Sequence, residues 1–363
     1  MVLQALPGIG PITLKHLLEA FNNDPCAILA AAPHALQKAE GVGPTLAKTI
    51  HQWDTTVDLP KLQARLTHLH ADFITLQDDG YPPLLKEIYD PPTGLYCLGN
   101  YRPNAMNVAI IGSRRCTLYG LGVARKLASE FASRGFCIVS GMARGIDSAA
   151  HEGALEAQGK TVAVLGTGLD VIYPPENEGL YHRIAQTGLV VSEFALGQRG
   201  DKTSFPRRNR LIAGMSQAVV VIETDKQGGS MITARFAAEQ GRHVFAVPGR
   251  IDQVSSRGCL QLIREGATLL TKAEDLLEEL PYLMGSVKPA QQELFEEPAW
   301  QELDLSEDER CVLGALREGG LMGDDALGQA TELEPQAVAS ALMMLEIKAL
   351  ITKRADGRFE SAV

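Results

Sequence analysis

The sequence predicts an α/β protein with a central doubly wound, mostly parallel β-sheet, a small helical N-terminal domain and a small C-terminal winged-helix domain. Between residues 107 and 280, apolar runs rich in β-branched residues alternate with helix-compatible segments. Such alternation is typical of a parallel sheet covered by helices on both faces. Residues 1–70 are instead rich in Ala and Leu at helical spacing, and residues 304–363 resume helical patterning. These changes of pattern divide the chain into its predicted domains.

Seven apolar runs are expected to form the central sheet. They are continuous rather than alternating, which fits strands buried on both faces. Their starts are about 22 to 30 residues apart, with no internal repeat of residue identity, so a doubly wound sheet is favoured over a repeat protein. The expected strands are residues 108–111, 137–139, 162–165, 189–191, 219–222, 244–247 and 267–270.

The composition is that of an ordinary globular protein, with 45% hydrophobic and 21% charged residues. No apolar run reaches the roughly 18 residues that span a bilayer, and the N-terminus lacks the basic-then-apolar pattern of a signal peptide. The six cysteines form no CxxC pair, which argues against a disulfide framework or a zinc site. We therefore expect a cytoplasmic protein, and we expect neither a metal nor a cofactor.

The net charge of −10 is concentrated in one stretch of the chain. Residues 274–309 hold twelve acids and one base, a net charge of −11, which leaves +1 for the rest of the chain. Within that rest, residues 199–210 carry five bases against Asp201 alone. A local basic patch of this kind can bind an anionic ligand whatever the total charge.

Two similar turns mark the N-terminal region, Gly8-Ile9-Gly10-Pro11 and Gly41-Val42-Gly43-Pro44. Each precedes a helical segment, residues 12–21 and 45–52. A Gly-apolar-Gly turn between helices exposes backbone N–H groups that can hold a phosphate, and these turns resemble the helix-hairpin-helix motif of DNA-binding proteins. Turns that only let helices pack are the other interpretation, and both stay open at this point.

The first strand of the α/β region leads to Gly112-Ser113-Arg114-Arg115. Open parallel sheets bind ligands at this place, at the carboxyl end of a strand before a helix. The dinucleotide fingerprint G-x-G-x-x-G does not follow the strand directly. Arginine binds phosphate oxygens in a bidentate manner and stacks on bases, so ligand contact is favoured over a solvated arginine pair.

After the second strand, Arg144 lies between Gly141 and Gly145 in a strand-to-helix turn. Asp147 is expected to be the N-cap of the next helix. His151 would lie one turn into that helix, and a packed or hydrogen-bonded histidine is favoured over a catalytic one because no Ser or Cys nucleophile is evident beside it.

After the third strand, Asp170 and Glu176 raise the possibility of paired carboxylates for acid–base chemistry. The step Pro174-Pro175 favours a rigid loop instead, with the two acids serving turns and caps.

Residues 202–210 combine a basic run with Phe205 next to Pro206. Lys and Arg neutralise phosphates, and Phe offers a face on which any base can stack. This pairing suits a single strand, whose bases are free, better than a duplex. A solvated helix start with Phe205 in the core is an equal alternative for this stretch taken alone.

A fourth small-residue loop, Gly228-Gly229-Ser230, follows the fifth strand and opens a helix, which makes an anion cradle of N–H groups and a hydroxyl. One rim of the sheet is therefore expected to collect glycine turns and bases into an extended polyanion groove. The bases are Arg114, Arg115, Arg144, Lys202, Arg208 and Arg250.

The C-terminal part begins with residues 281–303, a proline-containing acidic linker. In residues 304–363, Ser306 is expected to be an N-cap and Glu309 to complete a capping box. A second helix is expected over residues 333–345, and a hairpin over 351–359 that turns at Asp356-Gly357. Helices followed by a hairpin indicate a winged-helix unit.

Five motifs, in this order and context, resemble those of the DNA-processing protein A family, also called Smf. The resemblance is strong over about residues 80–280, and the flanking regions resemble the helical N-terminal and winged-helix C-terminal domains of many members. The motifs are Ile111-Gly112-Ser113-Arg114, Gly141-Met142-Ala143-Arg144-Gly145-Ile146-Asp147, Tyr173-Pro174-Pro175-Glu176-Asn177, Phe205-Pro206-Arg207-Arg208-Asn209-Arg210 and Ala246-Val247-Pro248-Gly249.

The resemblance implies an extended Rossmann-like domain over residues 71–280 that binds single-stranded DNA, forms a homodimer and loads a RecA-type recombinase during recombination and natural transformation. Other DNA-uptake proteins are further candidate partners, and neither enzymatic activity nor membrane association is expected. Arg114 matches the arginine of the Gly-Ser-Arg motif, and Lys202 and Phe205 match the basic and aromatic positions of the strand-binding loop. The predicted site consists of Gly112, Ser113, Arg114, Gly141, Arg144, Gly145, Lys202, Phe205, Arg208, Asn209, Gly228, Gly229 and Ser230.

The sequence departs from the family pattern at two places. Gly228 stands where a serine is usual, and Cys259-Leu260 replaces a small polar residue and an asparagine. The second departure puts the far end of the pocket in doubt, so residues 255–260 are left outside the predicted site.

The main alternative is a Rossmann-like nucleoside-monophosphate phosphoribohydrolase-type enzyme, which also uses glycine turns and a Gly-Gly loop. Such enzymes need a glutamate in the helix after that loop, and residues 230–238 contain no acid. An ATPase or helicase is disfavoured because no G-x-x-x-x-G-K-[ST] loop is present.

Overall fold

The computed structural model describes residues 1–103, 106–280, 305–348, 350–354 and 356–361. The chain divides into two compact units, a large one that contains the main sheet and a small one at the C-terminus. The predicted linker, residues 281–303, lies outside the described residues, and the four-part division of the chain stays a prediction. No helix of the described residues is long and apolar enough to cross a membrane.

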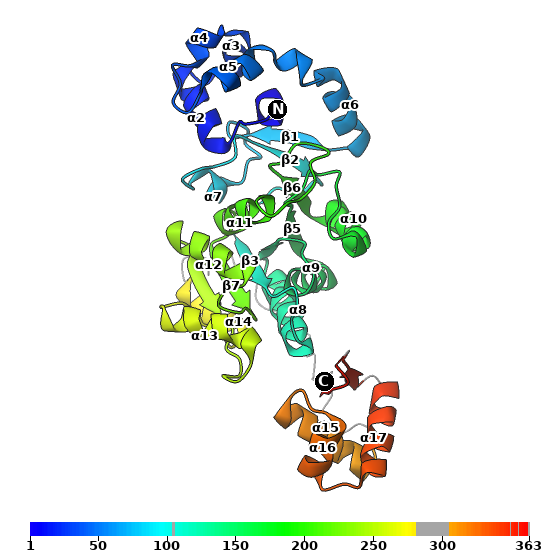
Figure 1. Cartoon of the computed structure of the whole chain (residues 1–363). Helices are drawn as coiled ribbons and strands as arrows, with labels where there is room; N and C mark the ends of the chain where they lie inside the picture. Colours follow the sequence, from blue (N-terminus) through cyan, green and yellow to red (C-terminus); the bar gives the residue numbers. More distant parts are fainter. Residues whose placement is uncertain (104–105, 281–304, 349, 355, 362–363) are drawn as a thin grey trace. The chain divides into compact units, whose positions relative to one another are not determined.

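The large unit is built on a nine-stranded sheet in the order β1-β2-β6-β5-β4-β3-β7-β8-β9 (Figure 1). The seven strands from β6 to β9 in this order are mutually parallel. They correspond to the seven predicted runs, so the predicted α/β sheet is confirmed. Their bounds are β3 (Asn107–Gly112), β4 (Cys137–Ser140), β5 (Lys160–Val164), β6 (Leu189–Ser192), β7 (Ala218–Ile222), β8 (His243–Ala246) and β9 (Thr268–Leu269).

Two strands at one edge of the sheet were not predicted. β2 (Gly94–Leu98) runs antiparallel to β6, and β1 (Asp72–Thr75) runs antiparallel to β2. The chain between them forms only the short helix α7 (Pro83–Lys86), because antiparallel neighbours need no crossover helix. The strand–helix rhythm that indicates the parallel strands is therefore missing here.

Helices cover both faces of the parallel strands (Figure 1). In β3, Ala109 and Ile111 pack in one hydrophobic cluster, and Val108 and Ile110 pack in another. Successive side chains of a strand point to opposite faces, so a strand with two covered faces must be apolar throughout. One face carries α11 (Ser204–Gly214), α12 (Gly229–Glu239) and α13 (Arg257–Arg264); the other carries α8 (Leu118–Ser133), α9 (Ile146–Glu156) and α14 (Ala273–Glu279).

A third cluster joins the N-terminal helices to β2, β5, β6 and α10 (Glu178–Thr187). Polar contacts support it, because Gln4 Nε2 donates to the carbonyl oxygen of Gly94 at 3.0 Å and Arg65 pairs with Asp170. The predicted glycine turns are present, with Gly8 and Gly41 at φ of +83° and +80°, values that favour glycine. The N-terminal helices are α1 (Val2–Ala5), α2 (Pro11–Ala20), α3 (Pro25–Ala30), α4 (Pro33–Leu36), α5 (Pro44–His51) and α6 (Leu59–Leu69).

The described residues of the small unit form three helices and a two-stranded antiparallel hairpin around a core of their own. The predicted capping box is confirmed, since Ser306 Oγ accepts from the Glu309 N–H and Glu309 accepts from the Ser306 N–H. The predicted hairpin is also present, although the assignment as a winged helix stays a prediction. The elements are α15 (Glu307–Gly319), α16 (Asp324–Thr331), α17 (Pro335–Ile347), β10 (Ile351–Lys353) and β11 (Phe359–Ser361).

Candidate nucleic-acid interface

A groove of about 770 Å³ lies at the carboxyl ends of β3 and β7. These neighbours mark the point where the strand order reverses, because the chain proceeds from β3 through β4, β5 and β6 on one side and returns to β7 on the other. At such a switch point the loops that follow adjacent strands separate, and open α/β sheets bind ligands there. The topology therefore creates the groove.

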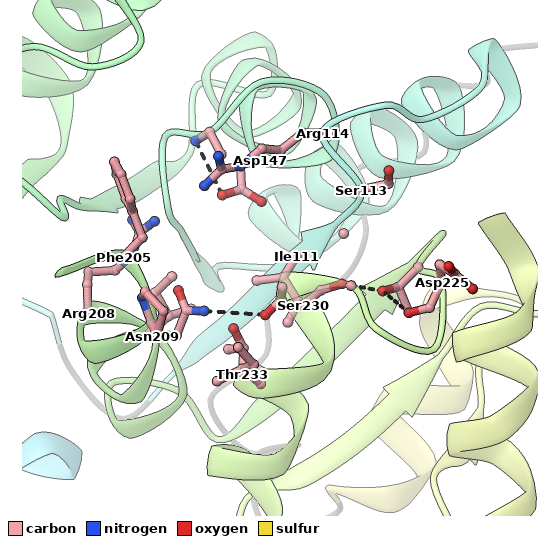
Figure 2. A pocket seen from close by; sticks show the side chains of 18 of the residues that line it. Ile111, Ser113, Arg114, Asp147, Phe205, Arg208, Asn209, Asp225, Ser230 and Thr233 are labelled. Atoms are coloured by element: carbon pink, nitrogen blue, oxygen red, sulfur yellow. Dashed lines mark hydrogen bonds between the residues drawn. The ribbon is translucent and has the colours of Figure 1, made fainter. Parts of the chain in front are cut away.

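Ten of the thirteen predicted site residues line this groove. Figure 2 shows side chains from the loop after β3, from α11 and from the start of α12 around the same space. The ten are Gly112, Ser113, Arg114, Lys202, Phe205, Arg208, Asn209, Gly228, Gly229 and Ser230. Gly141, Arg144 and Gly145 are on the adjacent loop after β4 and are not among its lining residues.

Three exposed cations line the groove: Arg114 and Arg115 after β3, and Lys202 before α11. The acid next to Lys202 is engaged elsewhere, because Asp201 accepts hydrogen bonds from the N–H groups of Thr203 and Ser204, each at 2.7 Å. Hydrogen bonds from Thr203 and Ser204 lower the pKa of Asp201, and they fix the start of α11. The groove thus offers positive charge that can neutralise phosphates.

Phe205 occupies a slot made by two glycines. A Cβ atom on Gly166 or Gly200 would lie 2.6 Å from its ring, so neither position has room for a side chain. The Arg114 guanidinium carbon is 5.4 Å from the ring centroid, within the range of a cation–π contact. Phe205 is only partly buried. It therefore lies in the groove wall rather than in the core, and base stacking on its ring stays a prediction.

Arg208 lies inside the wall, with 3% of its surface exposed. Its guanidinium donates to the carbonyl oxygens of Gly141, at 2.6 Å, and Val164, so it ties α11 to the ends of β4 and β5. Asp147 is also buried, and burial raises its pKa while the charge of Arg208 opposes that rise. Arg208 thus supports the loops of the groove from within.

Asp147 is not the N-cap that the sequence predicted. Gly145 holds that position in α9, with φ of +78°, and a Cβ there would lie 2.4 Å from the carbonyl oxygen of Ser113. The close approach of the two loops places the cap two residues earlier than expected. The Asp147 carboxylate instead accepts from the Ala143 N–H at 3.3 Å.

Two of the predicted rim cations do not line the groove. Arg144 pairs with Glu176, and Arg250 pairs with Asp252 at 3.1 Å. The sequence pattern identifies strand ends, but it does not show which bases are already paired with acids. Four of the six predicted bases, Arg114, Arg115, Lys202 and Arg208, therefore line the groove, and Arg144 and Arg250 lie outside its lining.

The Gly-Gly-Ser loop is anchored to both neighbouring elements. Ser230 Oγ donates to Thr224 Oγ1 at 2.6 Å, and Asn209 Nδ2 donates to the carbonyl oxygen of Gly229 at 3.4 Å. The first N–H groups of a helix have no intrahelical acceptor, so the start of α12 can hold an anion. Thr224 was not predicted, although it lies two residues after the end of β7 and the strand-end rule would have found it.

The remaining candidates for catalysis, His151, Asp170 and Glu176, are each engaged by another side chain of the protein. His151 is fully buried and its Nδ1 is 2.6 Å from Thr161 Oγ1, which confirms the packed, hydrogen-bonded interpretation. Asp170 pairs with Arg65, and Glu176 pairs with Arg144. Within the described ranges, no group of three or more His, Cys, Asp or Glu residues could hold a metal ion.

The family model for DNA recombination-mediator protein A matches residues 72–281. The chain belongs to this family. A second model, the SAM-like helix-hairpin-helix tandem, matches residues 1–52, in agreement with the paired glycine turns of the N-terminal helices.

Among relatives, DNA processing protein DprA of Streptococcus pneumoniae is 44% identical over 221 residues, 59% of this chain and 78% of that protein. Protein Smf of a Synechocystis strain is 39% identical over 278 residues, 75% of this chain and 70% of that protein. Both relatives are therefore matched over most of their length.

Two solved structures are similar to the chain. DNA processing protein A from S. pneumoniae matches with a TM-score of 0.65 at 38% identity, over 75% of this chain and 94% of that one. DNA processing protein A from Helicobacter pylori matches with a TM-score of 0.53 at 35% identity, over 59% of this chain and 98% of that one, and its structure is described as giving insight into a single-stranded DNA binding mode.

Proposed function

We propose that this protein binds single-stranded DNA in the groove at the ends of β3 and β7 and acts as a recombination mediator. One observation carries the proposal: exposed cations and a partly exposed aromatic ring line the same groove as a glycine-rich helix start. Cations neutralise the backbone without reading sequence, and an aromatic ring accepts any base. The DNA-binding mode described for the H. pylori relative supports the same ligand.

The arrangement favours a single strand over a duplex. Phe205 is set into the slot between Gly166 and Gly200 and is only partly exposed. A base must come to it with its face free, and bases in a duplex are stacked on each other. All thirteen predicted site residues are part of the proposal, with Arg208 supporting the groove from within and Gly141 and Gly145 allowing the loops to approach.

The role of the protein after it has bound DNA is inferred from its family membership. We infer that the bound strand is handed to a RecA-type recombinase during recombination or natural transformation, that the protein acts as a homodimer in the cytoplasm, and that other DNA-uptake proteins are candidate partners. The groove supports the first step of this sequence, since a mediator must hold a single strand before a recombinase can take it over.

A phosphoribohydrolase-type enzyme is the competing function. The first two turns of α12 carry no acid, and Asp147, which also lines the groove, is buried beside Arg208. Neither position offers an exposed carboxylate to a ribosyl carbon. The two exposed acids of the groove, Asp201 and Asp225, lie in loops outside the helix that follows the Gly-Gly step, and each carboxylate accepts a backbone N–H. A binding protein without catalysis therefore fits this groove better.

A binding titration tests the proposal. The full chain is titrated into a labelled single strand of mixed sequence and into the matching duplex, at two salt concentrations and without nucleotide or metal. We expect clear preference for the single strand and its loss in an Arg114→Ala, Lys202→Ala double variant. Equal binding that ignores these residues would overturn the proposal, and hydrolysis of nucleoside monophosphates would then be assayed. For the role after DNA binding, the protein should speed recombinase filament assembly on a strand coated with single-strand-binding protein.

A further inference from the structure

Tyr173 lies next to Phe205, just outside the groove, and adds a second aromatic ring to the one in the groove wall. Its ring centroid is 5.3 Å from that of Phe205, with the planes inclined by 41°, a common geometry for an attractive aromatic pair. Tyr173 is 39% exposed and is not one of the groove-lining residues. An exposed ring beside Phe205 offers a second face on which a base can stack.

A cation, Arg144, lies next to Tyr173. Arg144, half exposed, forms an ion pair with Glu176, and Glu176 together with the neighbouring Tyr173 side chain raises the pKa of Arg144. Asn177 Nδ2 donates to the carbonyl oxygen of Met142 and to Ser148 Oγ, each at 2.9 Å. These bonds tie the loop after β5 to the loop after β4. The aromatic ring and the cation are therefore held side by side on anchored backbone.

We propose that Tyr173 and Arg144 form a second nucleotide subsite, which takes the nucleotide next to the one in the groove. Tyr173 stacks its base and Arg144 binds its phosphate. This inference rests on the proposed function, because it needs a single strand in the groove, and it adds a direction in which the strand leaves, from Phe205 over Tyr173 towards Arg144.

Glu176 competes with the phosphate in this arrangement. Both side chains of the Arg144–Glu176 pair are about half exposed, at 50% and 51%, and exposed ion pairs contribute little to stability. A phosphate can therefore displace Glu176 from Arg144 at small cost. Neutralising Glu176 should accordingly strengthen binding, whereas removing Arg144 should weaken it.

The test compares strand lengths. Full-length protein is titrated with labelled thymidine monophosphate, which can fill the groove alone, and with a thymidine strand of about ten nucleotides, within the range of site sizes known for single-strand binding. The variants are Tyr173→Leu, Tyr173→Phe, Arg144→Gln and Glu176→Gln. Tyr89→Leu is the matched control, since Tyr89 is 82% exposed and does not line the groove.

We expect Tyr173→Leu to weaken binding of the longer strand by at least about fivefold and to leave binding of the mononucleotide unchanged, while Tyr173→Phe and Tyr89→Leu behave as the unchanged protein. Arg144→Gln should flatten the salt slope by about 0.7, the value of one single-strand phosphate, and Glu176→Gln should tighten binding. If Tyr173→Leu and Arg144→Gln leave the longer strand unaffected while Arg114→Ala weakens binding of both ligands, the subsite is wrong and the groove stands. If Arg114→Ala has no effect on either ligand, the proposed function itself fails.

Discussion

The guanidinium of Arg114 lies over the ring of Phe205, with 5.4 Å between the guanidinium carbon and the ring centroid. A single strand needs a cation for its phosphate and a ring for its base. In the free protein these two groups are thus in contact with each other. A base that stacks on this face of the ring must displace Arg114. The displaced guanidinium remains beside the bound nucleotide, where it can bind the phosphate.

Replacing Phe205 with alanine should cost about 1–3 kcal/mol of binding free energy for a single strand, the usual contribution of a base stacked on an aromatic ring. Phe205→Tyr should retain most of the affinity because it keeps the ring. Fluorescence anisotropy with a mixed-sequence strand measures both. Equal affinities of Phe205→Ala and the unchanged protein would show that no base stacks at this position.

Arg114→Ala and Lys202→Ala should each weaken binding about tenfold, since a hydrogen bond to a charged group contributes roughly 1.5–3 kcal/mol. The loss should be the same for every sequence, and each change should reduce the salt slope by about 0.7. Arg235→Ala is the control, because Arg235 is exposed on α12 and does not line the groove. Titrations at several salt concentrations provide the slopes, and a slope shared by all variants would exclude contact with phosphates.

The parallel sheet and the groove could be predicted because both follow from chain order. A strand buried on both faces must be apolar along its length, as in Val108–Ile111, and its carboxyl end must open onto the ligand edge. The edge strand Asp72–Thr75 could not be found this way, since only Ile74 is buried in it.

The depth of individual side chains could not be predicted. Phe205 and Arg208 are three residues apart in α11 and so lie on the same face of the helix, yet Phe205 borders solvent and Arg208 is buried. The difference is made by distant backbone, the glycines 166 and 200 beside the ring and the carbonyl groups around the guanidinium. Likewise, Glu176 is 32 residues from Arg144 in sequence, so their pairing is set by the fold.

Gly228 and Gly229 should respond differently to alanine. A Cβ on Gly228 would lie 2.3 Å from Thr224 Oγ1, the acceptor of the Ser230 hydroxyl, so Gly228→Ala should destabilise the fold by about 1–3 kcal/mol. No heavy atom lies within 4 Å of a Cβ on Gly229, so Gly229→Ala should fold normally but hinder a phosphate at the start of α12. Urea unfolding and strand titration separate the two effects. Normal binding by a well-folded Gly229→Ala variant would remove this helix start from the site.

Replacing Arg208 with methionine should destabilise the protein by about 3–5 kcal/mol, because it leaves the buried Asp147 carboxylate without its cation and frees the carbonyl groups of Gly141 and Val164. Adding Asp147→Asn should recover part of the loss by removing the buried charge. Denaturant unfolding followed by circular dichroism measures the free energies. A loss below about 1 kcal/mol in the single variant would mean that Arg208 is not a support of the groove.

His151 should make the stability of the large unit depend on pH. Burial lowers the pKa of His151 from 6.5 to about 3, and its Nε2 has no hydrogen-bond partner among the described residues. Above pH 6.5 the ring is neutral in both the folded and the unfolded chain, so its contribution is fully present. Below pH 6.5 His151 binds a proton in the unfolded chain but stays neutral in the folded chain. The free energy of unfolding therefore falls by about 1.4 kcal/mol per pH unit until the pH reaches the folded-state pKa near 3.

The histidine term can be isolated by comparing urea unfolding at pH 7.0 and pH 5.5 in the unchanged protein and in His151→Asn. Asparagine keeps an N–H donor for Thr161 but cannot be protonated, so the loss of stability between the two pH values should be smaller in the variant by about 1.3 kcal/mol. Titrations of the other seven histidines occur in both proteins and cancel in the difference. The same pH dependence in both would mean that the folded protein accommodates a charged His151, in conflict with its complete burial.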